Sequence, residues 1–431
     1  MNKKNGTIGL LGAISIGIGG MVGGGIFAVL GEAVSLAHGA TAIAFLVAGI
    51  VALLTSYSYA KLSVTYKSRG GTVLFIDKAF NHNLLAGSVN LMLWLSYLVT
   101  ISLYAVAFAS YGQTFFPNNE TAWLKHLLIS LAILLPVAIN LISASFVSKS
   151  ETLIVIIKII LLVFIIAASA SYVDIERLSP MKWGSSFSIV VSGMIIFVAY
   201  EGFELISNAA EDIKNPDTNL PRAFYGSVLL VILLYVLIAI ITVGTVPESQ
   251  LVMAKDYALA VAAKPALGQV GFTIVAVAAL LATFSAINAT IYGNARLSYM
   301  LAKEGELPES LANEKRNIPT LGVILTAALS LIMANSIDLS EIAIIGSASF
   351  LLIFFIVNVA AYKLHKAINA SKKITVLASL VSFMALMTLL IHTYSNTPRA
   401  IVIFLSFIAI SFLFELSYGK IIRKHIFSRP Y

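Results

Sequence analysis

The stretch GIGGMVGGGIFAVLG, residues 17–31, decides the fold of this chain. Six glycines lie between Gly17 and Gly25, and each glycine costs a helix interior about 1 kcal/mol relative to alanine. The flanking residues, LLGAIS before and IFAVLGEAVSL after, are nevertheless as apolar as a membrane-spanning helix. The stretch therefore predicts a membrane helix that is interrupted at its middle.

The composition is that of an integral membrane protein. Of the 431 residues, 59% are hydrophobic and 11% are charged, and the mean hydropathy is +0.94, whereas a soluble domain carries about 25% charged residues. Repeated apolar runs of roughly 20 residues are long enough to cross the hydrocarbon core as α-helices. The sequence has no cysteine, which excludes disulfides, a disulfide-linked partner subunit and cysteine-rich metal sites.

The apolar runs predict an all-α integral membrane protein with twelve transmembrane helices. They lie near residues 8–35, 40–62, 84–116, 124–144, 150–172, 185–211, 222–246, 267–301, 318–335, 339–362, 374–394 and 399–419. With the N-terminus in the cytoplasm, most of the 28 Lys and Arg fall on the cytoplasmic side, as the positive-inside rule requires. We therefore expect a multi-pass protein of the cell membrane with both termini cytoplasmic. The net charge of +8 then reflects topology, and no nucleic-acid partner is expected.

A second interruption falls in the sixth span, SIVVSGMIIFVAYEGFELISNAAEDI. There the segment AYEGFE, residues 199–204, places two carboxylates and a glycine at mid-membrane depth. The two broken spans are five spans apart, and paired interruptions of this kind point to the binding site of an inverted-repeat transporter. Spans 1–5 (about 8–172) and 6–10 (about 185–362) would be the repeats of a transport core over residues 1–372. Residues 373–431 would hold spans 11 and 12 and the C-terminus.

The chemistry of a broken helix suggests its ligand. Backbone groups left unpaired within a bilayer must line a cavity or bind something. Freed N–H groups at the start of the second half-helix favour a carboxylate, and freed carbonyls at the end of the first half-helix favour an ammonium. A zwitterionic amino acid carries both charges. Glycine permits the unwinding and the close approach of the ligand to the backbone.

Other interpretations of these residues are weaker. The spacing Gly23-x-Gly25-x-x-Ala28 matches a loose dinucleotide fingerprint, but no strand or βαβ unit surrounds it. The glycines could instead let two helices pack closely. Glu201 and Glu204 could merely lie in a wet internal crevice, although carboxylates within a membrane are functional by default.

Four motifs resemble those of the amino acid–polyamine–organocation (APC) transporters. GIGGMVGGGIF resembles the first-span signature of the family, and SRGGTVLFIDKAF its loop between spans 2 and 3, except that Ser68-Arg69 replaces a common proline. VAYEGFELISNAAEDIKNPDTNLPRAF resembles its sixth span with the following loop, and FSAINATIYGNARLSYMLAKEGELP its eighth span. Together they cover about residues 12–308, and the resemblance is greatest to archaeal proton-coupled members. It implies the LeuT-type fold of five-plus-five inverted repeats, with discontinuous helices 1 and 6.

The resemblance also implies a substrate site. The substrate carboxylate would bind the amides of Gly24 and Gly25, with Gly23 beside them. Its amino group would meet the carbonyls of Met21, Val198 and Glu201. Candidates for contact with the substrate side chain are Tyr104, Phe203, Asn288 and Tyr292, for each of which ordinary packing is the competing interpretation.

Lys158 is the basic residue buried within a span, in ETLIVIIKIILLVFI. It follows Ser150 by eight residues, which corresponds to about 12 Å along a helix. The alternative is that its side chain snorkels to the cytoplasmic surface. A lysine enclosed by apolar residues can lose and regain a proton, and proton-coupled members of the family resembling this chain carry a lysine at the matching place. Lys158 would then replace the sodium ion of related transporters, held by the carbonyl of Gly19 and by Ser285 or Thr283.

The function that these features predict is proton symport of amino acids into the cell by alternating access, with neutral amino acids as substrates. Glu204 would act as a gate or proton carrier near the second break. The alternatives are a sodium-independent exchanger, a carrier of cationic amino acids or polyamines, and a sensor that binds an amino acid without transporting it. The histidines have no metal-ligand spacing, so no metal or cofactor is expected, and the spans hold no nucleophile–base constellation that would indicate an enzyme. The partners would be substrate, protons and lipid, with the protein a monomer or weak oligomer.

Overall fold

The computed structural model describes residues 6–116, 121–142, 144–315 and 318–424. Within these ranges every regular element is a helix, apart from three isolated bridges. The described residues hold ten helices that are long and apolar enough to cross a membrane. Eight are unbroken: α3 (Thr41–Thr65), α5 (Leu84–Gln113), α6 (Ala122–Ile142), α7 (Ala144–Ser169), α10 (Pro216–Thr245), α15 (Leu339–Lys363), α16 (Lys372–Asn396) and α17 (Pro398–Tyr418). A ninth, α13 (Lys264–Lys303), is kinked near its start at Gly268.

The first span is bent where the glycines predict it. α1 (Leu10–Met21) and α2 (Gly25–Ala37) meet at 50°, and together they would form an eleventh span. α14 (Thr320–Ser336), a shorter apolar helix, occupies the predicted ninth span. Helices therefore fill all the predicted stretches, which confirms the all-α membrane class. The exact count of twelve spans stays a prediction, because α14 is only 17 residues long.

The sixth span is also broken at the predicted place. α8 (Ser186–Ile195) passes into the 3₁₀ helix η4 (Ile196–Tyr200), and the helix resumes only at α9 (Leu205–Asn208). Between them Glu201 is extended, with φ −64° and ψ 141°. Gly202 has φ +120°, a conformation open to glycine but strained for other residues. The backbone thus leaves the helix within the AYEGFE segment.

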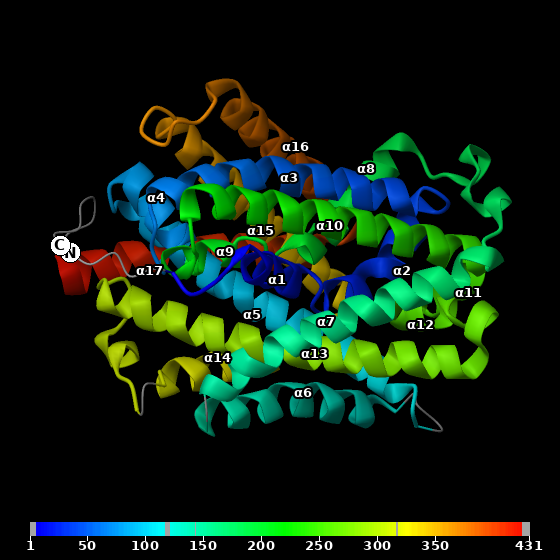
Figure 1. The fold of residues 1–431 in the computed structure, drawn as a ribbon. Helices are drawn as coiled ribbons and strands as arrows, with labels where there is room; N and C mark the ends of the chain where they lie inside the picture. Colours follow the sequence, from blue (N-terminus) through cyan, green and yellow to red (C-terminus); the bar gives the residue numbers. More distant parts are fainter. Residues whose placement is uncertain (1–5, 117–120, 143, 316–317, 425–431) are drawn as a thin grey trace.

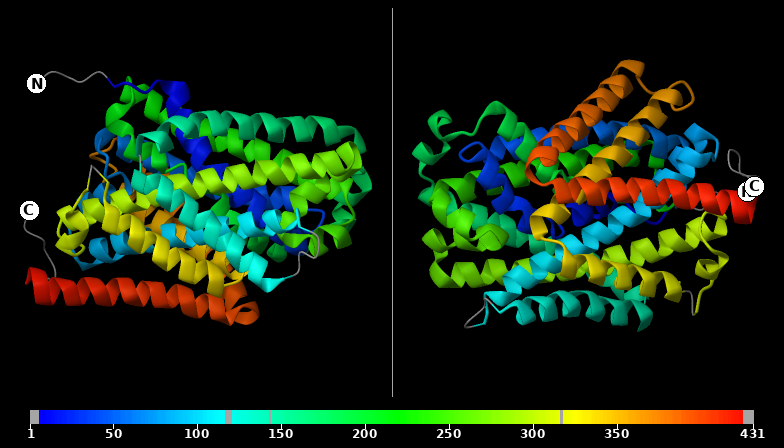
Figure 2. Two further views of the ribbon diagram at one scale, coloured as in Figure 1. Left: turned by 90° about the horizontal axis from the view of Figure 1, so that it is seen from below. Right: turned by 180° about the vertical axis from the view of Figure 1, so that it is seen from behind.

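The two broken spans lie at the centre of the bundle. Figures 1 and 2 show α1, α2 and α9 surrounded by α3, α5, α10 and α13, with α6 and α17 on the outside. The apolar window of the sixth span is 89% buried, against 22% for that of the last span. The division into a transport core of two inverted repeats and a two-helix addition stays a prediction.

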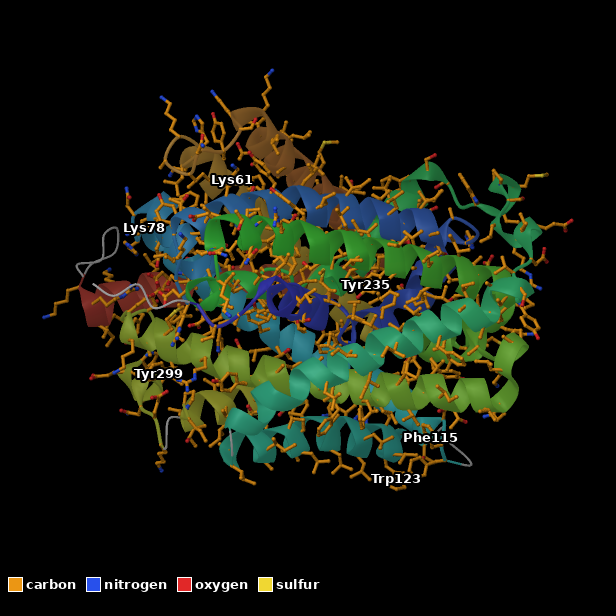
Figure 3. All side chains as sticks on the ribbon, viewed as in Figure 1. Lys61, Lys78, Phe115, Trp123, Tyr235 and Tyr299 are labelled. Atoms are coloured by element: carbon orange, nitrogen blue, oxygen red, sulfur yellow. The ribbon has the colours of Figure 1, made fainter. Side chains whose placement is uncertain are left out.

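Charged and aromatic residues mark the two ends of the bundle. Lys61 and Lys78 lie at the same end, whereas Phe115 and Trp123 lie toward the other (Figure 3). Trp123, at the start of α6, is exposed, as expected of an aromatic belt at a membrane interface. α17 ends near the lysine-bearing end (Figure 1). The predicted orientation, with both termini cytoplasmic, stays a prediction, and the terminal residues 1–5 and 425–431 lie outside the described part of the chain.

Candidate functional site

The two helix breaks touch each other through glycine. A Cβ atom on Gly20 would lie 2.6 Å from the carbonyl oxygen of Gly202, and one on Gly25 would lie 2.7 Å from Cα of Ala199. Real side chains are not accommodated at such distances, so the glycines are required for the backbones to meet. These glycines therefore do more than interrupt the helices, as the sequence predicts: they also let the two breaks contact each other.

A tyrosine from α10 joins the breaks. The hydroxyl of Tyr235 lies 2.7 Å from the carbonyl oxygen of Met21 and 3.1 Å from that of Ala199, within hydrogen-bond distance of both. The side chain is fully buried at the middle of the bundle (Figure 3). Tyr235 is not among the residues predicted from the sequence, although its lone hydroxyl within the apolar run VILLYVLIAII marks the position.

The two carboxylates of the second break face hydroxyl groups of α5. Tyr97 donates to Glu204 Oε1 at 3.2 Å, while the amide of Gly202 donates to Glu204 Oε2 at 2.8 Å. Thr100 Oγ1 lies 3.5 Å from Glu201 Oε2, at the limit for a hydrogen bond. Because Tyr97 and Thr100 are three residues apart, one face of α5 presents both hydroxyls. Glu201 and Glu204 are both buried, so the site holds two carboxyl groups able to accept a proton or attract a cation.

The first break is packed against Tyr104. Its ring lies over Gly24, where a Cβ atom would fall 2.7 Å from Cγ of the ring, and its hydroxyl lies 3.5 Å from the Cβ position of Gly23. α2 begins at Gly25, and the amides of a first helical turn have no acceptor within the helix. Tyr104 therefore stands beside the backbone that would bind an anionic group.

α15 holds the backbone of the second break from the other side. The amide of Val198 donates to Ser347 Oγ at 2.9 Å, and Ser347 Oγ donates to the carbonyl of Ile195 at 2.6 Å. Phe203 is buried in an aromatic cluster, its ring centroid 5.6 Å from that of Tyr59 and 5.2 Å from that of Phe354. The structure thus brings Val198 and Phe203 to the break. Their contact with a substrate stays a prediction.

Asn288 contacts α6 in this structure. Asn140 Nδ2 donates to Asn288 Oδ1 at 2.8 Å, and lies 3.2 Å from the backbone oxygen of the same residue. The side chain of Asn288 is thereby engaged across the α6–α13 interface, which fits the packing interpretation. Contact of Asn288 with the substrate stays a prediction.

Lys158 points into the bundle. It is 2% exposed, whereas its neighbours Ile157 and Ile160 on α7 are 41% and 60% exposed. α7 packs on α1 and α13, the helices that carry Gly19 and Ser285, both of which are buried. This enclosure disfavours snorkelling to the membrane surface, and contact of Lys158 with Gly19 and Ser285 or Thr283 stays a prediction.

Thr283 forms a hydrogen bond within its own helix. Its hydroxyl donates to the carbonyl of Ala279 at 2.7 Å within its own helix. This bond to the preceding turn uses the proton of the Thr283 hydroxyl but leaves a lone pair on its oxygen. A role for Ser285 or Thr283 in holding Lys158 stays a prediction.

Ion pairs join the elements on both sides of the breaks. At the end with the aromatic belt, Lys255 of η6 (Lys255–Tyr257) lies 2.5 Å from Glu32 of α2, beside a cavity of about 10 Å³ that has room for roughly one water molecule. At the lysine-bearing end, Arg69 lies 3.4 Å from Asp212, and Lys67 lies 2.8 Å from Asp217. Both ends of the central site are thus bridged by opposite charges.

A separate acidic cluster lies near the loop after α13. Carboxylate oxygens of Asp77, Glu304 and Glu306 lie within 4.8 Å of one another. Asn90 Nδ2 lies 3.0 Å from Glu306 Oε1 and 3.3 Å from Asp77 Oδ1. Hydrogen bonds from within the protein thus organise the buried part of this cluster, and it is not part of the site at the breaks.

The fold and the two joined breaks define a membrane transporter with a central backbone-lined site. A model of the amino acid permease family matches residues 8–419, and the chain belongs to this family. An uncharacterized protein of Methanocaldococcus jannaschii is 34% identical, covering 100% of this chain and 99% of the relative. The inner membrane transport protein YbaT of Escherichia coli is 34% identical, covering 93% and 94%. The branched-chain amino acid permease BcaP of Bacillus subtilis is 26% identical, covering 81% and 79%.

Family membership confirms several predictions made from the sequence. The chain is an APC-type membrane transporter of the amino acid permease family, and it is not placed among enzymes. Membership of this family shows that the protein is embedded in a membrane and that its substrate is an amino acid. Family membership does not specify the particular substrate, the coupling ion or the residues that bind them.

Proposed function

We propose that this protein imports neutral amino acids together with protons across the cell membrane, by alternating access to the joined helix breaks. The observation that carries the proposal is the contact of the two breaks at Gly20 and Gly202, with Tyr235 bridging their freed carbonyls. A site that presents both amides and carbonyls suits a zwitterion. The substrate carboxylate would take the amides of Gly24 and Gly25.

The ammonium group of the substrate would lie against the carbonyls of Met21, Val198 and Glu201. Phe203 supports a preference for neutral side chains, because its ring belongs to an apolar aromatic cluster next to the break. The name of the relative BcaP, a branched-chain amino acid permease, is in line with such substrates. Glu204, with its carboxylate fixed by Tyr97 and Gly202, would serve as the gate.

Lys158 is the proposed proton carrier. Its burial on the inner face of α7, near the helices of Gly19 and Ser285, supports this role. A lysine ammonium there could replace a sodium ion in one half of the cycle and lose its proton in the other. We propose that the protein acts as a monomer or weak oligomer.

The test is uptake of a labelled mixture of neutral amino acids into sodium-free proteoliposomes, with and without an inward proton gradient. We expect accumulation only with the gradient. Uptake that does not depend on the proton gradient and requires amino acid preloaded inside the vesicles would instead establish a sodium-independent exchanger. Strong competition by lysine, arginine or polyamines would favour the cationic carrier, for which the buried Glu201 is the specific structural reason. Binding without any uptake would identify a sensor.

A further inference from the structure

A groove lies apart from the helix breaks, on the outside of the bundle between α5, α15 and α17. Its volume is about 470 Å³, within the range of roughly 300–1,000 Å³ typical of small-molecule sites. The lining is mostly apolar, with Asn83, Ser88 and Ser411 as its polar members. Leu85 and Phe412, at the edges, are 43% and 45% exposed, so the groove opens sideways, toward the surrounding membrane. Figure 2 shows α17 crossing the outside of the bundle, where it forms one wall.

The groove spans one leaflet of a bilayer. Along α5 its lining runs from the N-cap Asn83 to Met92, nine helical steps or about 14 Å. Half of the hydrocarbon core is about 15 Å thick. α5 begins next to α4 (Thr72–Phe80), which carries Lys78 at the lysine-bearing end (Figure 3). The groove therefore lies in the leaflet on that side, and its length suits one acyl chain.

The mouth of the groove is polar and basic. Leu352 and Ile356 line the groove on α15, and Lys363 follows on the same face because it is seven residues beyond Ile356. The ammonium group of Lys363 lies 4.3 Å from the centre of the Phe80 ring, three residues before Asn83. Lys363 is exposed, so its charge is available at the depth of a lipid headgroup.

We infer that this groove binds one anionic phospholipid, with an acyl chain along α5 and the phosphate beside Lys363. The charge of the mouth is complementary to a phosphate, and a basic residue near an anionic membrane surface is worth about 1 kcal/mol. The aliphatic lining complements the chain. This inference is independent of the proposed transport cycle, because the groove shares no residue with the helix breaks.

Native mass spectrometry of the purified full chain tests the inference. The protein is equilibrated in detergent with equal amounts of phosphatidylglycerol and phosphatidylcholine, and bound lipid is counted. We expect one retained phosphatidylglycerol in preference to phosphatidylcholine. Lys363→Gln should reduce that preference about fivefold. The matched control is Lys303→Gln, since Lys303 is also exposed and also lies over a ring, that of Tyr299, on another helix.

Two variants test the acyl-chain part of the groove. Ser88→Trp should fill the groove and abolish retention of either lipid, and Leu85→Trp is a second such variant at a more exposed lining position. Equal losses for Lys363→Gln and Lys303→Gln would overturn the inference, as would full retention in both tryptophan variants. A lipid-free dimer that Ser88→Trp dissociates would also overturn it, because a second copy of the chain would then occupy the groove.

Discussion

At the scale of single residues, Lys158 carries the strongest functional prediction. Its ammonium group is enclosed on a helix whose neighbouring side chains are exposed to lipid. Lys158→Met keeps an apolar stem of similar length but removes the charge and the proton. We expect proton-driven accumulation to fall at least tenfold while exchange of preloaded amino acid persists. Proteoliposome uptake with an imposed pH gradient is the measurement.

The control for this variant is Lys303→Met, since Lys303 is exposed at the end of α13. It should retain gradient-driven uptake. Full pH-driven accumulation by Lys158→Met would contradict the role of Lys158 in proton coupling. Glu204 would then become the first candidate for the proton carrier.

Tyr235 gives a second prediction at this scale. Tyr235→Phe keeps the ring but removes the hydroxyl that reaches Met21 and Ala199. A typical hydrogen bond contributes about 0.5–1.5 kcal/mol, so we expect KM for transport to rise roughly two- to tenfold as the breaks lose their bridge. Tyr225→Phe, on the same helix and only half-buried, is the matched control. Equal kinetics for the two variants would show that the bridge has no role in substrate binding.

At the scale of elements, the breaks themselves were predictable but their surroundings were not. The glycine-dense stretch from Gly17 and the AYEGFE segment interrupt otherwise apolar spans, so composition alone located both breaks. Tyr235 could not be assigned, because nothing in a single sequence tells which face of a buried helix meets a break. The hydroxyls of Tyr97 and Thr100 were missed for the same reason.

The glycine at the second break should be irreplaceable. Gly202 has φ +120°, and a Cβ atom there would collide with the backbone of Gly20. Strain of this kind costs about 1–3 kcal/mol before the clash is counted. We expect Gly202→Ala to lower the thermal unfolding temperature and to abolish uptake.

Gly293→Ala provides the comparison within a regular helix. Gly293 lies in α13, and a Cβ atom there would meet nothing within 4 Å. This variant should be neutral or slightly stabilising, since alanine is favoured over glycine in helices. If Gly202→Ala unfolds and transports like Gly293→Ala, the close contact of the breaks does not constrain the protein.

At the scale of the whole molecule, the charged pairs at the two ends should act in opposition. Alternating access requires that the site open to one side while it is closed to the other. Glu32–Lys255 bridges one end, and Arg69–Asp212 bridges the other. Weakening either pair should therefore shift the population toward opening at that end and away from opening at the opposite end. A rigid channel or a simple loosening of the bundle would not produce such opposite effects.

Thiol labelling can measure this opposition, because the chain has no native cysteine. Ala343 is buried and lines the small cavity beside Glu32 and Lys255, so Ala343→Cys should react slowly with a membrane-impermeant maleimide added outside. Adding Lys255→Gln should speed labelling about two- to fivefold, the range for a partly exposed ion pair. Adding Arg69→Gln should slow it. Faster labelling with both substitutions would mean that the pairs only hold the bundle together, and that the two ends are not coupled through the central breaks.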